Sequence, residues 1–347
     1  CQMADITFMA LHGSIGENGK LQATFDNLGI KYTGPNSLGC TLSMNKLVTK
    51  QIFKTSGVPT PRGTSLTSKT KDTPLDELGY YLPLVVKPCS NGSSIGVYIC
   101  HTEEEYYDAI HKSFDVDNTD EVVIEPFIKG REFACGILAG KALPLVEIVP
   151  KDGLFDYANK YQAGGASEIC PPVSLDEETQ ELIQRAGERA FEALRMDVYS
   201  RADFIVSDAD GEFYCLEMNA LPGMTAASLL PKAAKAAGYD VFWKDNDDGC
   251  KKVCDRIGKT DAKQGNKQPY CFGNYCHDEI LLDGLEKQLQ TITRNTVIVL
   301  HMMGSHGPTY YKRYPDKFKR FTPACDTASL QDCSRQQIIN SYDNTIV

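Results

Sequence analysis

The chain has 347 residues, 42% of them hydrophobic, and 46 acidic against 36 basic side chains give it a formal net charge of −10. This length allows two or three domains, each with its own core. The acidic balance argues against a nucleic-acid-binding protein, and no run of about 18 apolar residues that could cross a membrane is present.

The start of the chain predicts a glycine-rich turn followed by a helix. The apolar run Ile6 to Leu11 leads directly into His12 and the glycine loop 16–19, and a helical stretch that contains Lys46 runs from 44 to about 57. His12 could cap or line the core, or contact a ligand, and the residues alone leave both interpretations open.

Two apolar strand patterns, each with a charged residue near its end, come next. Lys87 lies in the first, Leu84 to Pro88, and Glu125 ends the second, which begins at Val122. Between them, the small residues 91–96 predict a loop that closes over phosphates. Taken alone, the lysine is equally well explained as a strand-end residue that reaches for solvent, and the loop's serines as ordinary turn residues.

A long loop and a helix are predicted further along. Residues 152–170 read as a surface loop, and loops of this length without regular structure often act as lids. Residues 174–196 form the clearest predicted helix, which a capping box of Ser174 and Glu177 would begin.

The stretch 201–224 is the most informative for chemistry. The apolar runs Phe204 to Val206 and Phe213 to Leu216 flank the turn 207–211, which predicts a β-hairpin. Such a hairpin brings three side chains with oxygen ligands to one end: Asp203, Glu217 and Asn219. Two carboxylates and an amide oxygen favour Mg²⁺ on nucleotide phosphates, although a solvated hairpin with ordinary polar ends explains these residues equally well.

In their order and spacing, these motifs resemble the D-alanine–D-alanine ligases of the ATP-grasp superfamily over residues 1–238. The resemblance implies an α/β ATP-grasp fold. A truncated N-terminal α/β domain (1–44) would precede a central domain (45–130) and a C-terminal domain with the magnesium site (131–238). In the implied reaction, a D-alanine carboxylate attacks the γ-phosphate of ATP, and a second D-alanine displaces phosphate from the acyl phosphate. The product, D-alanyl-D-alanine, is a peptidoglycan precursor.

The resemblance also assigns roles to individual residues. ATP would be bound by Lys46, Lys87, Ser93, Ser94, Glu125, Ile128, Glu132 and Lys160. Catalysis would involve Arg201, Ser93, Lys160 and Tyr161. Two Mg²⁺ ions, or Mn²⁺, would be bound by Asp203, Glu217 and Asn219. D-alanine would contact His12, Tyr161, Gly223, Ser228 and Leu229. The family further implies a cytoplasmic homodimer, and the Lys160-Tyr161 pair matches a D-alanine rather than a D-lactate acceptor, with D-serine left open.

The chain departs from the family's pattern in several places. Pro126 stands where many relatives carry a lysine, and Ala220 and Ala227 replace polar residues of the family motifs. The family has a βαβ portion before the point at which this chain begins, including a glutamate for the first D-alanine. We therefore expect a fragment whose first substrate subsite is incomplete.

The cysteine pattern changes near Gly238. Residues 1–238 hold seven scattered cysteines, which suit a reducing cytosol, whereas residues 239–347 hold six in three close pairs. These pairs are Cys250/Cys254, Cys271/Cys276 and Cys325/Cys333. No pair has the short spacing of a zinc knuckle, so we favour disulfides.

Two predicted elements follow this change. A helix at 277–292 would place five apolar residues on one face: Ile280, Leu281, Leu285, Leu289 and Ile292. A buried strand at 295–300 would deliver the segment 301–308 to the end of a sheet where ligand sites usually lie. Val241 to Trp243 predicts another strand after a helix that ends at Gly238.

Residues 239–347 resemble part of the catalytic domain of lipid A phosphoethanolamine transferases, which are zinc-dependent, membrane-anchored and periplasmic. The resemblance implies a partial α/β sandwich, with Lys251 at the phosphoethanolamine site and His306 on the substrate side or at a second metal. The nucleophile and most zinc ligands of that family lie outside this stretch. We therefore expect it to be inactive and His306 to be an ordinary loop histidine.

Three hypotheses about function remain. The first is a truncated ligase with a foreign segment appended near Gly238, and the second is a zinc-dependent transferase. The third is no enzyme at all, only an ATP-binding remnant or a mis-joined chain. The two resemblances also conflict over compartment, because ATP-dependent ligases of this kind act in the cytoplasm.

Overall fold

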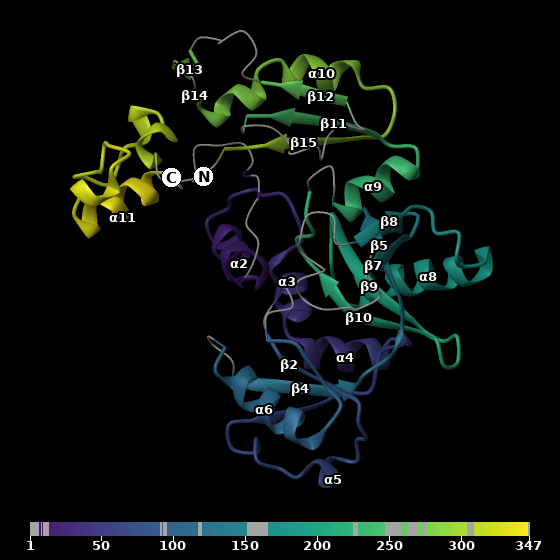
Figure 1. Cartoon of the computed structure of the whole chain (residues 1–347). Coiled ribbons are helices and arrows are strands. Elements are labelled where there is room, and N and C mark those ends of the chain that lie inside the picture. Colours follow the sequence, from purple (N-terminus) through teal and green to yellow (C-terminus); the bar gives the residue numbers. More distant parts are fainter. Residues whose placement is uncertain are drawn as a thin grey trace. The chain divides into compact units, whose positions relative to one another are not determined.

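The computed structural model of the chain is shown in Figure 1. The residues that it describes are 7, 9, 14–90, 92, 96–116, 120–150, 166–224, 228–246, 258–262, 269–272, 275–303 and 309–345. They form two compact units, Cys1–Gly223 and Met224–Val347. Among these residues, no helix is both long and apolar enough to cross a membrane.

Four helices come first in the first unit. They are α1 (Ser14–Glu17), α2 (Lys20–Asn27), α3 (Ser37–Met44) and α4 (Lys46–Thr55). The side chain of Asn45 accepts a hydrogen bond from the backbone N–H of Val48, so an asparagine cap fixes where α4 begins. The predicted helix at 44–57 is thereby confirmed.

The first sheet of this unit has the strand order β1-β4-β2-β3, and all its pairings are antiparallel. Its strands are β1 (Thr64–Thr67), β2 (Leu84–Pro88), β3 (Tyr98–Cys100) and β4 (Glu121–Pro126). The helices α5 (Leu75–Leu78) and α6 (Glu103–Phe114) accompany it. Buried Tyr106 and Ile110 of α6 pack with Leu84, Val86 and Ile124 of the sheet. The two predicted strands around Lys87 and Glu125 are confirmed.

The second sheet follows the order β10-β9-β5-β7-β8, with β6 paired to β5. Its strands are β5 (Gly130–Leu138), β6 (Lys141–Ala142), β7 (Val146–Pro150), β8 (Ala166–Ile169), β9 (Tyr199–Ser207) and β10 (Phe213–Asn219). Buried Ile183 and Ala190 of α8 (Glu177–Ala193) belong to the same core as Phe133 and Phe204 of the sheet. The predicted hairpin at 201–219 is confirmed as β9 and β10.

The predicted capping box at the start of α8 is wrong. The helix begins at Glu177, and its cap is Asp176, whose carboxylate accepts a hydrogen bond from the Thr179 backbone N–H at 2.8 Å. Ser174 lies before the cap, and its carbonyl accepts a hydrogen bond from Arg131 instead. A carboxylate at the cap also interacts favourably with the positive end of the helix dipole.

The second unit contains a parallel sheet with the order β12-β11-β15. Helix α9 (Leu229–Ala236) leads into β11 (Asp240–Asp245), and the other strands are β12 (Gly258–Asp261) and β15 (Thr296–His301). A small antiparallel pair, β13 (Cys271–Phe272) and β14 (Tyr275–Cys276), lies between them in the chain. The strands predicted at 241–243 and 295–300 are confirmed.

The single helix predicted at 277–292 is wrong. The segment divides into a short 3₁₀ helix, η1 (Asp278–Leu282), and α10 (Leu285–Thr291). Gly284 separates them with a φ of 72°, a left-handed conformation that favours glycine. Ile280 and Leu281 are buried as expected, whereas the Leu289 side chain on α10 is 53% exposed.

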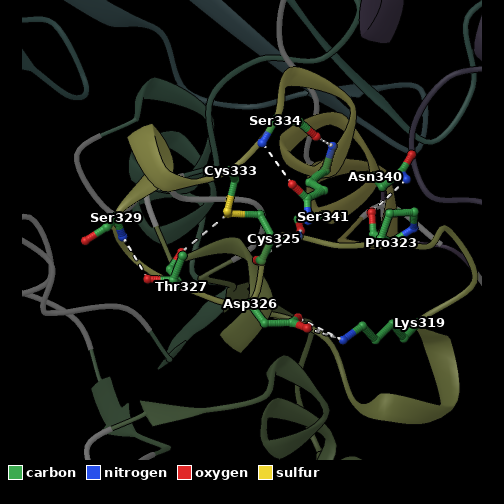
Figure 2. Close-up of a disulfide and its surroundings, with 11 residues drawn as sticks. Lys319, Pro323, Cys325, Asp326, Thr327, Ser329, Cys333, Ser334, Asn340 and Ser341 are labelled. Carbon is green, nitrogen blue, oxygen red and sulfur yellow. Dashed lines mark hydrogen bonds and ion pairs between the residues drawn. A yellow bond between two sulfur atoms is a disulfide. The ribbon is translucent and has the colours of Figure 1, made fainter.

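The C-terminal part of this unit is built from short helices around a disulfide (Figure 2). The helices are η2 (Tyr310–Lys312), η3 (Asp316–Phe318), η4 (Leu330–Asp332) and α11 (Arg335–Asn344). Cys325 and Cys333 are bonded, as are Cys271 and Cys276. These two predicted disulfides are confirmed, while Cys250 and Cys254 lie outside the described residues.

Candidate functional site

The hairpin of β9 and β10 brings the predicted metal ligands together. Glu217 pairs across the hairpin with Asp203, and Asn219 pairs with Arg201. The Arg201 guanidinium contacts both carboxylate oxygens of Asp203 at 2.7 Å, and the Asn219 amide nitrogen donates to one of them at 2.9 Å. Four of the predicted residues therefore form one polar cluster at one end of the hairpin.

A β-bulge sets the direction of these side chains. The register shifts between Cys215, which pairs with Phe204, and Glu217, which pairs with the adjacent residue Asp203. A bulge places two residues of one strand opposite one residue of the other. Cys215 and Met218 are both buried in the core, although regular alternation would put residues three apart on opposite faces. The shift therefore leaves Glu217 beside Asp203 and not on the face of the sheet that packs in the core.

The oxygen atoms of this cluster suit a hard divalent cation that takes its remaining ligands from water and substrate phosphates. Among the described residues, no group of three or more His, Cys, Asp or Glu side chains could hold a metal ion by itself. The hairpin offers the carboxylates of Asp203 and Glu217 and the amide oxygen of Asn219. Mg²⁺ is typically held by one or two carboxylates together with water and substrate phosphates, so this donor set suits a metal delivered with a nucleotide.

A second cluster, buried in the same unit, consists of two lysines and one glutamate. Glu125 on β4 is 3% exposed, and one of its oxygens forms an ion pair with Lys87 of β2. Its other oxygen lies 2.6 Å from the Nζ of Lys50 on α4. Burial alone would raise the pKa of Glu125, but the two ammonium groups outweigh it and lower that pKa, so the carboxylate is ionised.

Lys46 adds a third buried lysine to this region. It opens α4, it is 8% exposed, and its backbone N–H donates to the carbonyl of Cys89 at 2.9 Å, just beyond β2. Desolvation lowers the pKa of Lys46, and the charge of Glu217 opposes that shift whereas Lys87 adds to it. Buried lysines are stable as cations only where negative charge compensates them, so the region favours an anionic ligand.

Lys50 is the residue that the sequence analysis missed. It is 6% exposed, and its Nζ donates to the Pro61 carbonyl at 3.1 Å and to the Thr60 hydroxyl at 3.3 Å. The available signal was its spacing of four residues from Lys46, which puts both side chains on one face of a helix. Helix α4 presents both lysines to the buried side instead of to solvent.

Ile128 lies in the connection between β4 and β5, which joins the two sheets of the first unit, and Glu132 lies near the start of β5. Ile128 lines a cavity of about 520 Å³ together with Arg62, Phe127 and Tyr214, and Glu132 pairs with Ile205 in the second sheet. Neither Glu125 nor the buried lysines line this cavity. Two other lining residues adjoin the buried charges, because the Pro61 carbonyl accepts a hydrogen bond from Lys50 and Pro126 follows Glu125 in the chain.

Three of the remaining predicted residues lie on either side of the chain boundary between the two units. Gly223 ends the first unit, whereas Ser228 caps α9 and Leu229 is its first residue, in the second unit. The residues that lie outside the described part of the chain are His12, Ser93, Ser94, Lys160, Tyr161, Lys251 and His306.

At the ends of β11 and β15 in the second unit, the described polar groups bind one another. Asn246 donates to the Asp278 carboxylate at 2.7 Å and to the Cys276 carbonyl at 3.0 Å. The same carboxylate oxygen accepts the Met303 backbone N–H at 2.8 Å. These contacts hold the chain around the sheet end that was expected to carry a ligand.

Two protein families match the chain in different places. The family described as D-ala D-ala ligase C-terminus matches residues 52–242, and the sulfatase family matches residues 210–347. The first covers more than half of the chain. The second fits the expected change of character in the C-terminal part, and the two matches overlap over residues 210–242.

Curated relatives agree with the first family. The D-alanine–D-alanine ligase of Geobacter sulfurreducens is 44% identical over 231 residues, which cover 66% of this chain and 71% of the relative. D-alanine–D-alanine ligase A of Bacillus cereus is 40% identical, with 77% and 83% covered. The D-alanine–D-alanine ligase of Pediococcus pentosaceus is 41% identical over 68% of this chain and 66% of the relative. The chain thus spans about two thirds to four fifths of the length of these relatives.

Solved structures give the same result. The D-alanine–D-alanine ligase from Bacillus anthracis complexed with ATP matches with a TM-score of 0.58 and 40% identity, covering 67% of this chain and 74% of that one. The VanG D-Ala:D-Ser ligase from Enterococcus faecalis matches with a TM-score of 0.60 and 30% identity, covering 68% and 69%.

Proposed function

The chain belongs to the D-alanine–D-alanine ligase family, and from this premise we propose that its first unit binds Mg-ATP and catalyses ATP-dependent joining of two D-amino acids. The observation that carries the proposal is the buried cluster of Lys46, Lys50 and Lys87, which has one glutamate, Glu125, at its centre. Desolvation lowers the pKa of both Lys46 and Lys50, and the phosphates of a triphosphate would supply negative charge that stabilises their cationic forms.

In this proposal the lysines bind phosphate oxygens and the acids hold the nucleoside. Lys46 and Lys87 neutralise charge on the β- and γ-phosphates, which phosphoryl transfer needs more than covalent chemistry. Glu125 and Glu132 hold adenine and ribose, with Ile128 contacting the base. Ser93 and Ser94 close over the phosphates, and Lys160 and Tyr161 cover the site from the long loop.

Asp203, Glu217 and Asn219 would hold two Mg²⁺ ions, or Mn²⁺, brought in with the nucleotide. When bound, the ions would balance the charge that develops on the phosphate oxygens during transfer. Arg201 would then release Asp203 and donate to the oxyanion of the tetrahedral intermediate. His12, Gly223, Ser228 and Leu229 would contact the D-alanine substrates.

The proposed reaction proceeds in two steps. A carboxylate oxygen of the first D-alanine forms a bond to the γ-phosphorus, the bond from that phosphorus to the β,γ-bridging oxygen breaks, and ADP leaves. The amine of the second D-alanine attacks the acyl carbon, loses a proton, and expels inorganic phosphate. D-serine remains an alternative second substrate, which parallel assays with each amino acid would distinguish.

The direct test uses the full chain with Mg-ATP and D-alanine. Coupled phosphate release and mass spectrometry of the dipeptide should both report turnover, and both signals should vanish without D-alanine or Mg²⁺. Phosphate release without any dipeptide would contradict ligation and leave only nucleotide hydrolysis. Cytoplasmic residence and a homodimer, which belong to the same proposal, are checked by cell fractionation and by analytical ultracentrifugation.

The sulfatase match over residues 210–347 favours a second candidate activity. Under this alternative, the second unit transfers phosphoethanolamine to lipid A with bound zinc, and Lys251 and His306 contact the substrate. Metal analysis of the purified chain separates the two proposals. One zinc per chain, retained through dialysis, would support the alternative, and zinc-free protein with unchanged folding would exclude it.

A further inference from the structure

The ammonium group of Lys50 contacts two uncharged oxygens in addition to the carboxylate that balances its charge. Its Nζ lies 2.6 Å from Glu125, 3.1 Å from the carbonyl of Pro61 and 3.3 Å from the hydroxyl of Thr60. An ammonium group has three protons, and these three oxygens surround it on the buried side. Lys50 is thus fixed between helix α4, strand β4 and the segment 58–63.

The position of Lys50 also defines the position of the glutamate. Glu125 is almost fully buried, and its two oxygens have different partners, Lys87 on β2 and Lys50 on α4. An ion pair at each oxygen restricts rotation of the Glu125 carboxylate about its last torsion. Without Lys50, both oxygens would compete for Lys87 alone, and that lysine would be drawn away from any phosphate.

Segment 58–63 extends this link to the other sheet of the same unit. The Pro59 carbonyl accepts a hydrogen bond from the Cys215 backbone N–H at 2.7 Å. Cys215 lies on β10 immediately before the bulge that places Glu217 beside Asp203. Adding a Cβ to Gly63 would bring it within 2.9 Å of the Lys50 side chain, so the segment packs directly along that side chain.

We propose that Lys50 is a positioning residue of the nucleotide site: it fixes the Glu125 carboxylate for the base, leaves Lys87 available for phosphate, and couples both to β10. The inference rests on the proposed function, because it assigns Lys50 a role in binding ATP. Lys50 acts through Glu125 and does not itself contact the nucleotide.

A purely structural role for Lys50 makes a different prediction. In that case Lys50→Met would lower the stability of the fold and leave the affinity and base preference of the folded fraction unchanged. A positioning role changes the Kd for ATP and the preference for ATP over GTP, because the group that faces the base loses its orientation. Equilibrium binding to folded protein therefore separates the two roles.

The experiment measures Mg-ATP and Mg-GTP binding to the full chain by calorimetry, with circular dichroism to confirm folding. Lys50→Met should raise the Kd for ATP about 10- to 100-fold, the loss expected for a charged hydrogen-bonding partner. It should also reduce the preference for ATP over GTP. Lys50→Arg, which keeps the charge, should recover part of the loss.

The matched control is Lys54→Met. Lys54 lies one turn further along the same helix and is exposed, so its loss should leave both Kd values unchanged. A double-mutant cycle with Glu125→Gln then tests the route of the effect. If Lys50 acts through Glu125, Lys50→Met should cost far less in the Glu125→Gln background than in the wild type.

Two results would overturn the inference. One is unchanged ATP affinity in folded Lys50→Met, and the other is an equal loss in both backgrounds of the cycle. If Lys50→Met does not fold, the same cycle is run with Lys50→Gln, which also removes the charge, with the same criteria. Failure of the wild-type chain to bind Mg-ATP would instead contradict the proposed function itself.

Discussion

The first unit keeps its described cysteines as thiols, whereas the second joins all of its described cysteines in disulfides. Five of the six free thiols are buried, at Cys40, Cys89, Cys100, Cys135 and Cys215, and all six belong to the first unit. The second unit has the pairs Cys271–Cys276 and Cys325–Cys333. Disulfides persist in oxidising compartments and buried thiols in reducing ones.

The cores differ in the same way. The fully buried aromatic side chains of the described residues, Tyr106, Phe53, Phe133 and Phe204, are all in the first unit. A described cluster of the second unit contains Ala262, Ile280 and Leu281 together with the disulfide between Cys271 and Cys276. Apolar burial therefore stabilises the first unit without cross-links, and covalent closure compensates for a smaller core in the second.

The largest expected effect comes from removing a buried charge from the first unit. We expect Lys87→Met to lower kcat/KM for ATP-dependent phosphate release about 100- to 1,000-fold, since it removes one cation from the transferred phosphate. The matched control is Lys141→Met on β6, an exposed lysine in a strand, which should retain wild-type activity. Equal activity of both variants would contradict a phosphate role for Lys87.

The next largest effect concerns the disulfide of Figure 2. Replacing Cys325 and Cys333 by serine opens a loop with a sequence separation of 8. The chain-entropy relation predicts a loss of about 2–3 kcal/mol in the free energy of unfolding. Hydrogen exchange should therefore accelerate in peptides from 309–345.

Peptides from 199–219 serve as the internal control for this variant, because no described disulfide lies in the first unit. Their exchange should stay at the wild-type rate. Unchanged exchange in 309–345 would show that two kinds of hydrogen bond hold this region without the disulfide. The Ser341 hydroxyl accepts from the Cys325 backbone N–H and donates to the Cys325 carbonyl, and Asn340 donates to the Pro323 carbonyl.

A smaller effect tests backbone packing in the first unit. A Cβ on Gly130 would lie 2.0 Å from the Val206 carbonyl, so Gly130→Ala must push β5 away from β9. We expect a loss of about 1–3 kcal/mol in the free energy of unfolding by urea. Gly92→Ala, where the nearest atom to the added carbon is a Glu17 carboxylate oxygen at 3.4 Å, should cost less, and the reverse order would contradict this packing.

The smallest effect is a pH dependence. Desolvation lowers the pKa of Lys46 from 10.5, so between the folded pKa and 10.5 the unfolded chain binds more protons than the folded chain. The free energy of unfolding without nucleotide should therefore rise with pH in that window, by at most about 1.4 kcal/mol per pH unit. Lys46→Met should reduce the slope of the free energy of unfolding against pH. An unaltered slope would contradict the assignment of this pH dependence to Lys46.

The sequence predicted the elements whose signal is local. Apolar runs of strand length around Lys87 and Glu125, and on both sides of the turn at 207–211, became β2, β4, β9 and β10. Cysteine spacing predicted two disulfides, and the hairpin predicted that Asp203, Glu217 and Asn219 meet. In each case the decisive contacts lie within a short stretch or between adjacent strands.

The failures had physical reasons of their own. Helical periodicity at 277–292 contained no information on the left-handed Gly284, and Asp176 competed with Ser174 for the same cap. Lys50 was missed because its role depends on Glu125, which is 75 residues away in the chain and on a different element. Buried ion pairs between distant elements leave no periodic trace in a sequence.

The bulge on β10 has a consequence for how alternation along that strand is interpreted. Before it, Phe213 and Cys215 face the core; after it, Met218 does, so the buried positions change from odd to even numbers within one strand. In a strand with unbroken alternation, Glu217 would face the core, among apolar side chains. One inserted residue thus lets a single strand serve two environments in succession, a hydrophobic interior and a carboxylate pair.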